Sequence, residues 1–462
     1  MVPSSAISGA AAARAPETYP APMKIIVLGA GHVGRTLIDA LHDRHDVAVI
    51  DTSDARLEAL SDRYDVRVVH GDGTTRKVVQ KAGGEEADLL IACSSREEVN
   101  LVSAILVKRI SRAKTVVRTT SMELLDAWRE GELDVDFMVS PELETANAIA
   151  GIVGLPAARQ TDVFAEGKVQ IVEFDVSGDV ADDGLLGQPL RSARIPADSK
   201  VAGVVRRGEM ILPRGDEEIR PGDRVVVIGS PASARAWSDR LAHGEGVLSD
   251  IVIFGAGRMG TAIARVLLDR GMRVRIIDAR ADRAHDCAEE LPGARVFHAD
   301  AFDPAFLERQ RIGEAAAVFC MNDDARNLYA AVLAKVHGAR LTIALVHDPT
   351  SAEVYERGGV DVTMNPRELT AEEMVRFAHD PRIKQIAMLE GDRFEVLDIT
   401  VRADSELANK AFKDLPATNS IIGAVIRDDE VIFPHGSDVL APGDRVIVFV
   451  ESARAWAAEQ AL

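Results

Sequence analysis

The sequence predicts an α/β protein in which two Rossmann-like domains, each with a doubly wound parallel sheet, are each followed by a small α+β domain. Three observations lead to this fold class. The second half of the chain repeats the first, each half opens with short apolar runs that alternate with segments of helical period, and each half closes with strand patterns and Pro-Gly-Asp turns. At 462 residues the chain is also too long for one ordinary hydrophobic core.

The repeat is carried by motifs that recur at a nearly constant offset. In the large domains this offset runs from 255 − 29 = 226 to 298 − 70 = 228 positions, over four pairs: Gly29 with Gly255, Asp51 with Asp278, His70-Gly71-Asp72 with His298-Ala299-Asp300, and Asn100-Leu101 with Asn327-Leu328. The small domains repeat as well: Pro221–Val225 recurs as Pro442–Val446, and Ser233–Trp237 recurs letter for letter as Ser452–Trp456. The chain is therefore a duplication, and two glycines within 243–249 indicate the linker.

Short apolar runs in the front part of each half predict buried strands. In the first half these runs are Ile25–Leu28, Val47–Ile50, Arg67–His70, Leu89–Ala92, Thr115–Arg118 and Phe137–Val139. Six such strands alternating with helices indicate a parallel sheet with helices on both faces. From about Val169 and about Phe394 the pattern changes to alternating strands, tight turns and one closing helix, which predicts the two small domains.

Each large domain carries a glycine motif that is typical of dinucleotide binding. The segments Gly29–Gly34 (GAGHVG) and Gly255–Gly260 (GAGRMG) each follow an apolar strand and open a helix. The first glycine allows the tight turn, the second lets a pyrophosphate approach the backbone, and the third lets the helix lie close to its strand. The helix N-terminus then presents N–H groups to the phosphates. The alternative is a glycine turn in a domain that binds nothing, and a duplicated half can lose its site.

Polar residues at the ends of the next strands complete the predicted sites. Asp51 and Asp278 can accept hydrogen bonds from the ribose hydroxyls and would repel a 2′-phosphate, so NAD(H), ATP or ADP is favoured over NADP(H). Asp51 can also cap the helix that follows it, and both roles can hold together. Four further side chains follow the third and fourth strands, at the sheet edge where ligands bind: Asp72, Asp300, Ser94 and Asn322. Asp72 and Asp300 serve equally well as turn or cap residues.

Composition and charge exclude several classes of function. The net charge of −19 argues against nucleic-acid binding, which needs a basic surface, and against direct adsorption to anionic lipid. The chain contains no HExxH, GxSxG or paired-cysteine motif, and its histidines are scattered, so we expect no catalytic site and no metal site.

The cysteines and the apolar runs predict a cytoplasmic protein. Cys93, Cys287 and Cys320 are odd in number and each lies in or beside an apolar run, which favours buried free thiols. No apolar run reaches the roughly 18–20 residues needed to cross a bilayer. Residues 1–22 are rich in Ala, Pro and Ser, and we expect a disordered leader there rather than a signal peptide.

With these motifs in hand, the chain resembles the TrkA family, the peripheral nucleotide-binding subunits of Trk potassium-uptake systems. In that family, paired RCK (KTN) domains of Rossmann type alternate with RCK-C (TrkA-C) domains. The resemblance spans about 23–458, and the order large, small, large, small is its specific part. It places the first RCK-N domain at 23–155, the first RCK-C domain at 165–245, the second RCK-N domain at 249–380 and the second RCK-C domain at 390–462.

The resemblance implies features that composition does not show. Family members form ring-like tetramers beneath a membrane transporter of the TrkH/TrkG type, bind NAD(H) and ATP or ADP, and change ring shape with ligand. An Arg after the GxG contacts the terminal phosphate of ATP in relatives. Arg258 matches that Arg, whereas His32 departs from it. A Pro-Glu pair after the sixth strand also lies near the phosphates in relatives. Pro141-Glu142 matches it, whereas Pro366-Arg367 does not, so the two halves are expected to be inequivalent sites.

The predicted ligand-binding residues fall into two sets, one for each half. They are Gly29, Gly31, His32, Val33, Gly34, Asp51, Asp72, Ser94 and Glu142 in the first half, and Gly255, Gly257, Arg258, Met259, Gly260, Asp278, Asp300 and Asn322 in the second.

The function that these features favour is regulation rather than catalysis. We expect a cytoplasmic homotetramer, peripheral at the inner face of the cell membrane, in which bound nucleotide shifts the ring between two shapes that a potassium transporter reads. An NAD-dependent oxidoreductase is the alternative, but the repeated small domains offer no evident proton donor. A redox-sensing transcription regulator is disfavoured by the acidic charge and the lack of a helix-turn-helix segment.

Overall fold

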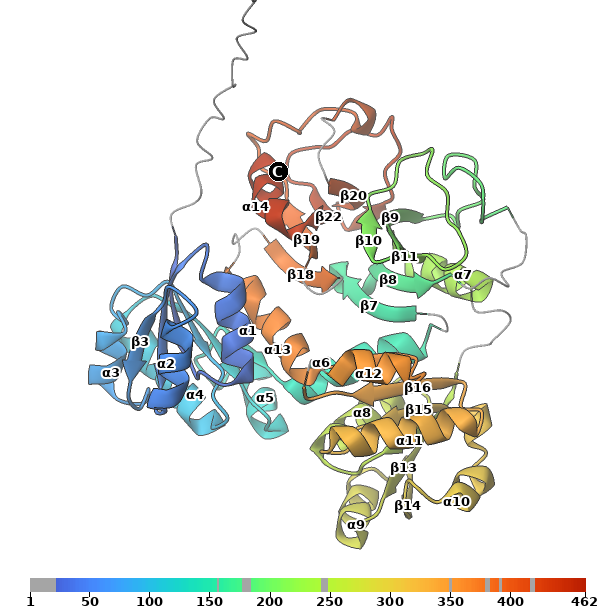
Figure 1. Cartoon of the computed structure of the whole chain (residues 1–462). Coiled ribbons are helices and arrows are strands. Elements are labelled where there is room, and N and C mark those ends of the chain that lie inside the picture. The colour runs from blue at the N-terminus through green and yellow to red at the C-terminus, as the bar shows by residue number, and fades with distance from the viewer. Residues whose placement is uncertain are drawn as a thin grey trace, which may run out of the picture.

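The computed structural model describes residues 22–155, 158–176, 184–241, 248–348, 351–378, 383–389, 393–415 and 420–462. Within them, two six-stranded parallel sheets alternate along the chain with two five-stranded antiparallel sheets (Figure 1). The predicted fold class is therefore confirmed. The predicted leader, apart from its last residue, and most of the predicted linker lie outside the described residues.

The first large domain is a sheet in the order β3-β2-β1-β4-β5-β6, and all six predicted runs are strands of it. Its strands are β1 (Lys24–Leu28), β2 (Asp46–Asp51), β3 (Arg67–His70), β4 (Leu89–Ala92), β5 (Lys114–Arg118) and β6 (Phe137–Val139). The helices that follow them are α1 (His32–Leu41), α2 (Asp54–Ser61), α3 (Arg76–Lys81), α4 (Glu97–Ile110), α5 (Met122–Arg129) and α6 (Pro141–Val153). The strand order reverses between β1 and β4, so a crevice forms at their carboxyl ends.

The second large domain repeats this topology in the order β14-β13-β12-β15-β16-β17. Its strands are β12 (Asp250–Phe254), β13 (Arg273–Asp278), β14 (Arg295–His298), β15 (Ala316–Phe319), β16 (Leu341–Leu345) and β17 (Val362–Met364). Its helices are α8 (Arg258–Asp269), α9 (Ala281–Glu290), α10 (Pro304–Arg309), α11 (Asp324–Val336), α12 (Ala352–Arg357) and α13 (Pro366–Val375).

The small domains are antiparallel sheets, each closed by one helix. The first contains β7 (Ala158–Phe164), β8 (Val169–Asp175), β9 (Ser199–Arg206), β10 (Glu209–Ile211), β11 (Arg224–Gly229) and α7 (Pro231–Leu241). The second contains β18 (Ile383–Leu389), β19 (Phe394–Thr400), β20 (Ser420–Arg427), β21 (Glu430–Ile432), β22 (Arg445–Glu451) and α14 (Ser452–Ala461). Strands β7 and β18 begin before 165 and 390, where we expected the small domains to start. Buried residues of both sheets form one shared core, so the two small domains pack face to face.

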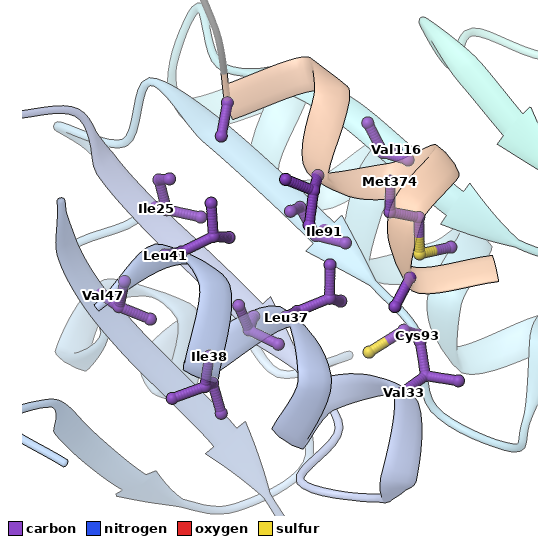
Figure 2. Packing of buried hydrophobic residues seen from close by; sticks show 14 of the residues in the cluster. Ile25, Val33, Leu37, Ile38, Leu41, Val47, Ile91, Cys93, Val116 and Met374 are labelled. Atoms are coloured by element: carbon purple, nitrogen blue, oxygen red, sulfur yellow. The ribbon is translucent and has the colours of Figure 1, made fainter. Parts of the chain in front are cut away.

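The two large domains exchange their last helices. Helix α6 leaves the first sheet and packs on α8, where Ile149 and Val153 join the core of the second half. Helix α13 leaves the second sheet and packs on α1 (Figure 1). Figure 2 shows Met374 of α13 beside side chains of the first half such as Leu37 and Ile91. Each large domain is therefore completed by a helix from the other half.

Candidate functional site

The glycine turn between β1 and α1 has the tight geometry that the motif predicts. Gly29 has a φ of 111°, a conformation that side chains disfavour. A Cβ on Gly34 would lie 1.8 Å from the carbonyl oxygen of Gly29, so α1 approaches its own turn only because residue 34 is glycine. In the second half Gly255 has a φ of 120°, and a Cβ on Gly260 would lie 1.8 Å from the oxygen of Gly255. The turn is therefore duplicated in its backbone detail.

Gly31 differs from its neighbours because nothing within the described chain requires it to be glycine. It is the N-cap of α1, with φ −76° and ψ −165°, which any residue can adopt. A Cβ added there would meet no atom of the described residues within 4 Å. Gly257 is the same, with φ −81°, ψ −179° and equally open space. The absent side chain leaves room for a group from outside the chain, directly at the N-terminus of a helix.

Asp51 lies at the end of β2 and holds the glycine turn in place. One carboxylate oxygen accepts a hydrogen bond from the Ala30 N–H at 2.7 Å, and the other accepts one from the Ser53 N–H at 2.8 Å. Asp51 is not the N-cap of α2, as the alternative interpretation had it, because that position is held by Ser53. Asp278 makes the matching bonds to the N–H groups of Ala256 and Arg280, both at 2.8 Å. Each carboxylate oxygen keeps a second lone pair that can accept a further bond from a ligand.

Asp72 and Ser94 lie in the lining of the first cleft, as the strand-end pattern predicts. Asp72 accepts hydrogen bonds from the backbone N–H and the hydroxyl of Thr74, which hold the pKa of its carboxyl below the usual range. The Ser94 N–H donates to Oδ1 of Asn100 at 3.0 Å. In the second half the N–H of Met321 makes the corresponding bond to Asn327 at 2.9 Å, so Met321, and not Asn322, is the counterpart of Ser94.

Other predicted residues lie around the two turns without sharing one pocket. Val33 lines the first cleft, whereas Met259 is partly buried against the core of the second half. Asp300 accepts a hydrogen bond from the Phe302 N–H at 3.1 Å, as a turn aspartate does.

The first cleft has a volume of about 370 Å³ and an arginine-rich rim. The arginines in its lining come from four separate elements: Arg56, Arg96, Arg118 and Arg367. The aspartates in the same lining are Asp51 and Asp72. A net positive cleft in a chain of net charge −19 is an environment that concentrates anions. Sequence reasoning missed these arginines, although Arg118, at the carboxyl end of β5, follows the strand-end pattern.

Arg367 reaches the first cleft from the second half of the sequence. It lies at the start of α13, the helix that packs on α1, and one of its guanidinium nitrogens donates to the carbonyl oxygen of His347 at 2.9 Å. Burial, together with the charges of Arg367 and Arg35, lowers the pKa of His32 below 6.5. The imidazole is therefore neutral at pH 7, and Arg367 supplies the positive charge that His32 lacks.

The exchanged helix also moves Glu142 away from the place that we expected for it. Glu142, at the start of α6, lies beside the second glycine turn in a pocket that also contains Ala256, Thr261 and Arg258. It is absent from the described lining of the first cleft. Burial raises the pKa of its carboxyl, and the charges of Arg258 and Arg118 oppose that shift. Because α6 crosses to the other half, its glutamate is presented to the second site.

The second cleft lacks most of the first cleft's arginines at the equivalent positions, although the pocket beside its glycine turn is lined by Arg258, Arg265 and Arg283. Asp323 is the N-cap of α11, as Arg96 is of α4, so an anion replaces a cation there. The carbonyl of Leu345 accepts a bond from Asn327 at 3.0 Å, as the carbonyl of Arg118 does from Asn100, so leucine replaces arginine. Glu142 is the second residue of α6, as Arg367 is of α13, so a carboxylate also replaces the fourth arginine. Only Arg56 has a cationic counterpart: it is the third residue of α2, and Arg283 is the third residue of α9.

The three cysteines are free and buried, as predicted. Cys93 lies under the first glycine turn, and its thiol donates weakly to the Leu28 carbonyl oxygen at 3.5 Å. Burial raises the pKa of Cys93 to about 12, and that of Cys320 likewise. These thiols therefore support the turn as small apolar groups and carry no negative charge toward the cleft.

The described residues contain neither a metal-binding cluster nor a membrane-spanning helix. No group of three or more His, Cys, Asp or Glu side chains there is arranged to hold a metal ion. In the same part of the chain, no helix is both long enough and apolar enough to cross a membrane.

The fold and the clefts define a class of protein with paired Rossmann-type nucleotide-binding domains and accessory antiparallel domains. The TrkA-N domain model matches residues 25–141 and 251–366, and the TrkA-C domain model matches residues 179–242 and 396–461. The chain belongs to the TrkA family.

Similar proteins agree with this assignment, and similar solved structures agree with the fold. The chain is 33% identical to a Trk system potassium uptake protein TrkA homolog of Archaeoglobus fulgidus, over 93% of this chain and 97% of that protein. It is 30% identical to the Trk system potassium uptake protein TrkA of Halomonas elongata, over 94% and 96%. Among solved structures, the GsuK RCK domain matches with a TM-score of 0.59 and 20% identity, over 95% of each chain. The GsuK channel bound to NAD matches with a TM-score of 0.61 and 19% identity, over 94% and 78%.

Proposed function

We propose that this chain is a regulatory subunit of a Trk-type potassium transporter and that its first cleft binds NAD(H), ATP or ADP. The observation that carries the proposal is the open space at Gly31. Neither backbone conformation nor packing explains a glycine there, whereas a pyrophosphate seated on the N-terminus of α1 does. The family relatives are named as Trk potassium uptake proteins, and a neighbour in fold is a channel bound to NAD.

The lining of the first cleft offers partners for both the ribose and the phosphates of an adenosine-containing anion. Asp51 lies where the ribose hydroxyls would donate, and a carboxylate at that point disfavours a 2′-phosphate. Arg56, Arg96, Arg118 and Arg367 surround the path of the phosphates, where each can make charge-assisted hydrogen bonds. The second cleft keeps the glycine turn and Asp278 but carries Glu142, so we propose that it binds more weakly.

The exchanged helices can couple nucleotide binding to the arrangement of the two halves. A phosphate bound at Gly31 and Arg367 contacts both halves of the chain at once, because α13 begins with Arg367 and continues into the core around α1. Exchanging ATP for ADP removes one phosphate and changes how firmly the halves are held together. A ligand shifts a conformational equilibrium only through such a difference, typically about 1–3 kcal/mol.

Exposed apolar side chains on equivalent helices support assembly into a ring. Helix α4 exposes Val102 and Ile105, and α11 exposes Tyr329 and Val336, the last at 77%. Such residues are suited to contacts between copies of the chain. We propose a homotetramer at the inner face of the cell membrane, attached through a transporter subunit of the TrkH/TrkG type. Tyr329→Lys combined with Val336→Lys should lower the mass measured by light scattering.

The test is a calorimetric titration with NAD⁺, NADH, ATP and ADP on the wild type, Asp51→Asn and Asp278→Asn. The first cleft is the tight site of this proposal, because we expect the second to bind more weakly. Nucleotide binding at the tight site should weaken by about tenfold in Asp51→Asn and stay unchanged in Asp278→Asn. The same nucleotides are then compared by solution scattering and by potassium flux with the reconstituted transporter. Lack of affinity for every nucleotide, or identical scattering and flux with ATP and ADP, would refute the proposal.

A further inference from the structure

The closing helices of the two small domains carry the same five-residue motif in different structural positions. Helix α7 begins two residues after the end of β11, and α14 begins two residues after Val450 of β22. Gly229 pairs with Ser199 and Val450 pairs with Ser420, so these strand positions are equivalent. Trp237 is the seventh residue of α7, but Trp456 is the fifth residue of α14. The motif Ser-Ala-Arg-Ala-Trp has therefore moved two positions along the helix.

A two-residue shift turns the tryptophan to the opposite side of the helix. At 3.6 residues per turn, two residues correspond to roughly 200° of rotation. In α7 the Trp237 ring is fully buried on the sheet, and its Nε1–H donates to the Ser199 hydroxyl at 2.9 Å. In α14 the seventh position is Ala458. The second sheet thus receives a methyl group at the position where the first receives an indole.

Where the first small domain has the Trp237 indole, the second has a cavity of about 610 Å³ between α14 and its sheet. Helix α14 lines it with small residues, Ala457, Ala458 and Ala461. The opposite wall includes Ile422 and Val448, which pair with one another, as do their counterparts Val201 and Val227 beneath Trp237. The volume falls within the range of sites that bind small organic ligands.

The charged side chains that line this cavity are all basic. The titratable side chains in its lining are those of Lys200, Lys413, His435 and Arg454, with no Asp or Glu among the described lining residues. The main-chain carboxylate of Leu462 also lines the cavity, and one of its oxygens accepts a hydrogen bond from the Arg402 N–H at 2.6 Å. Lys200 comes from β9 of the other small domain, and its ammonium lies 6.0 Å from the Phe412 ring centroid. Asp438 lies near enough to raise the pKa of Lys200, although burial has the larger effect and lowers it. Arg454 pairs with Glu451 at 3.4 Å.

We propose that this cavity binds a small amphipathic anion, with an aliphatic or aromatic body against the alanines of α14 and an anionic head between Lys200 and Lys413. Apolar walls with a few cationic groups at the edge complement such a molecule, and in the described part of the chain neither lysine has an ion-pair partner. The site is separate from both glycine turns, so it is independent of the proposed nucleotide binding. It contacts both small domains, because Lys200 belongs to the first and α14 to the second.

The experiment uses the full chain and two probes, decanoate and indole-3-propionate, each compared by calorimetry with its neutral alcohol. Both acids, or one of them, should bind saturably, with the neutral partner about tenfold weaker. The relative affinity of the two acids distinguishes an aliphatic from an aromatic natural ligand. Equal binding of acid and alcohol, or no binding of either acid, would overturn the proposal.

Two variants locate the site. Ala458→Trp restores an indole at the seventh helical position and should abolish binding, while ATP affinity and the melting temperature report an intact fold. Lys413→Gln should weaken the acid about tenfold and leave the alcohol unchanged. Trp456→Phe, which alters the motif outside the cavity lining, is the matched control and should bind as the wild type does. Unchanged acid binding in Ala458→Trp would place the ligand elsewhere and refute the site.

Discussion

The first and second clefts have the same glycine turn and the same strand-end aspartate, but the charges around them differ. Asp51 and Asp278 hold their turns with hydrogen bonds of 2.7–2.8 Å at matching positions. The first cleft has four arginines in its lining, whereas the second has Asp323, Leu345 and Glu142 at three of the four equivalent positions. Duplication has thus kept the backbone scaffold of both sites while the side chains that select a ligand have diverged.

The exchanged helices explain why the two halves cannot diverge independently. Arg367 is encoded in the second half and serves the first cleft, whereas Glu142 is encoded in the first half and serves the second. A substitution at the start of α6 or α13 therefore changes the site of the opposite half. This arrangement makes the pair of large domains one structural unit.

The largest expected effect concerns the exchange itself. Met374→Ala removes a fully buried side chain of α13, and we expect a loss of about 2–5 kcal/mol in the free energy of unfolding. Hydrogen exchange should quicken mainly in α1, because α13 packs on that helix and Met374 shares its core with Leu37 of α1. Ile149→Ala, on α6, is the matched control and should instead affect β12 and α8. If each substitution acted on its own half of the sequence, the helix exchange would not exist in solution.

The next effect tests the open space at the helix N-termini. Gly31→Asp should weaken nucleotide binding at the tight site by about 100-fold, because a carboxylate would occupy and repel the phosphate position. The melting temperature should hardly change, since the new side chain enters open space. Gly257→Asp makes the same change in the second half and should leave the tight site unaltered. Equal losses in both variants would show that the clefts are equivalent.

A smaller effect should distinguish the roles of Arg367 and Glu142, the charged residues at the starts of the two exchanged helices. Arg367→Gln removes one charge-assisted contact, and ATP should bind about tenfold more weakly at the tight site. The loss should be smaller for a ligand whose phosphates do not reach α13. Glu142→Gln is the control for a charge change at the equivalent helix start and should not reduce ATP binding. Unaltered ATP affinity in Arg367→Gln would remove the second half from the first site.

The smallest effect is a dependence of stability on pH at the second cleft. Burial raises the pKa of Glu142 above 4.5, so the folded state holds this proton more tightly than the unfolded state. Ionised Glu142 therefore costs stability, and the cost grows as the pH rises from 4.5 through the folded pKa. Glu142→Gln should melt slightly above the wild type at pH 7, and the difference should vanish near pH 4. A higher melting temperature for the wild type at pH 7 would contradict this sign.

The duplication, the fold class and the glycine turns could be predicted from the sequence alone, because they depend on local periodicity and on steric limits at single positions. All six strands of the first sheet coincide with predicted runs, and Gly29 and Gly255 have the positive φ that a tight turn needs. Asp51 and Asp278 were predictable for the same reason, since a fixed spacing along the chain brings the end of one strand to the next turn.

Which half completes which cleft, and where the repeated tryptophan points, became visible only in the packing of the folded chain. A crossing helix can follow its strand onto its own sheet or onto its neighbour's, and no local pattern distinguishes the two paths. The sequence therefore pointed to Glu142 but could not predict which cleft Glu142 and Arg367 serve. Likewise, identical letters in Ser233–Trp237 and Ser452–Trp456 hide a two-residue shift against the preceding strand. Side-chain direction on a helix depends on where the helix begins, and packing on the sheet fixes that point.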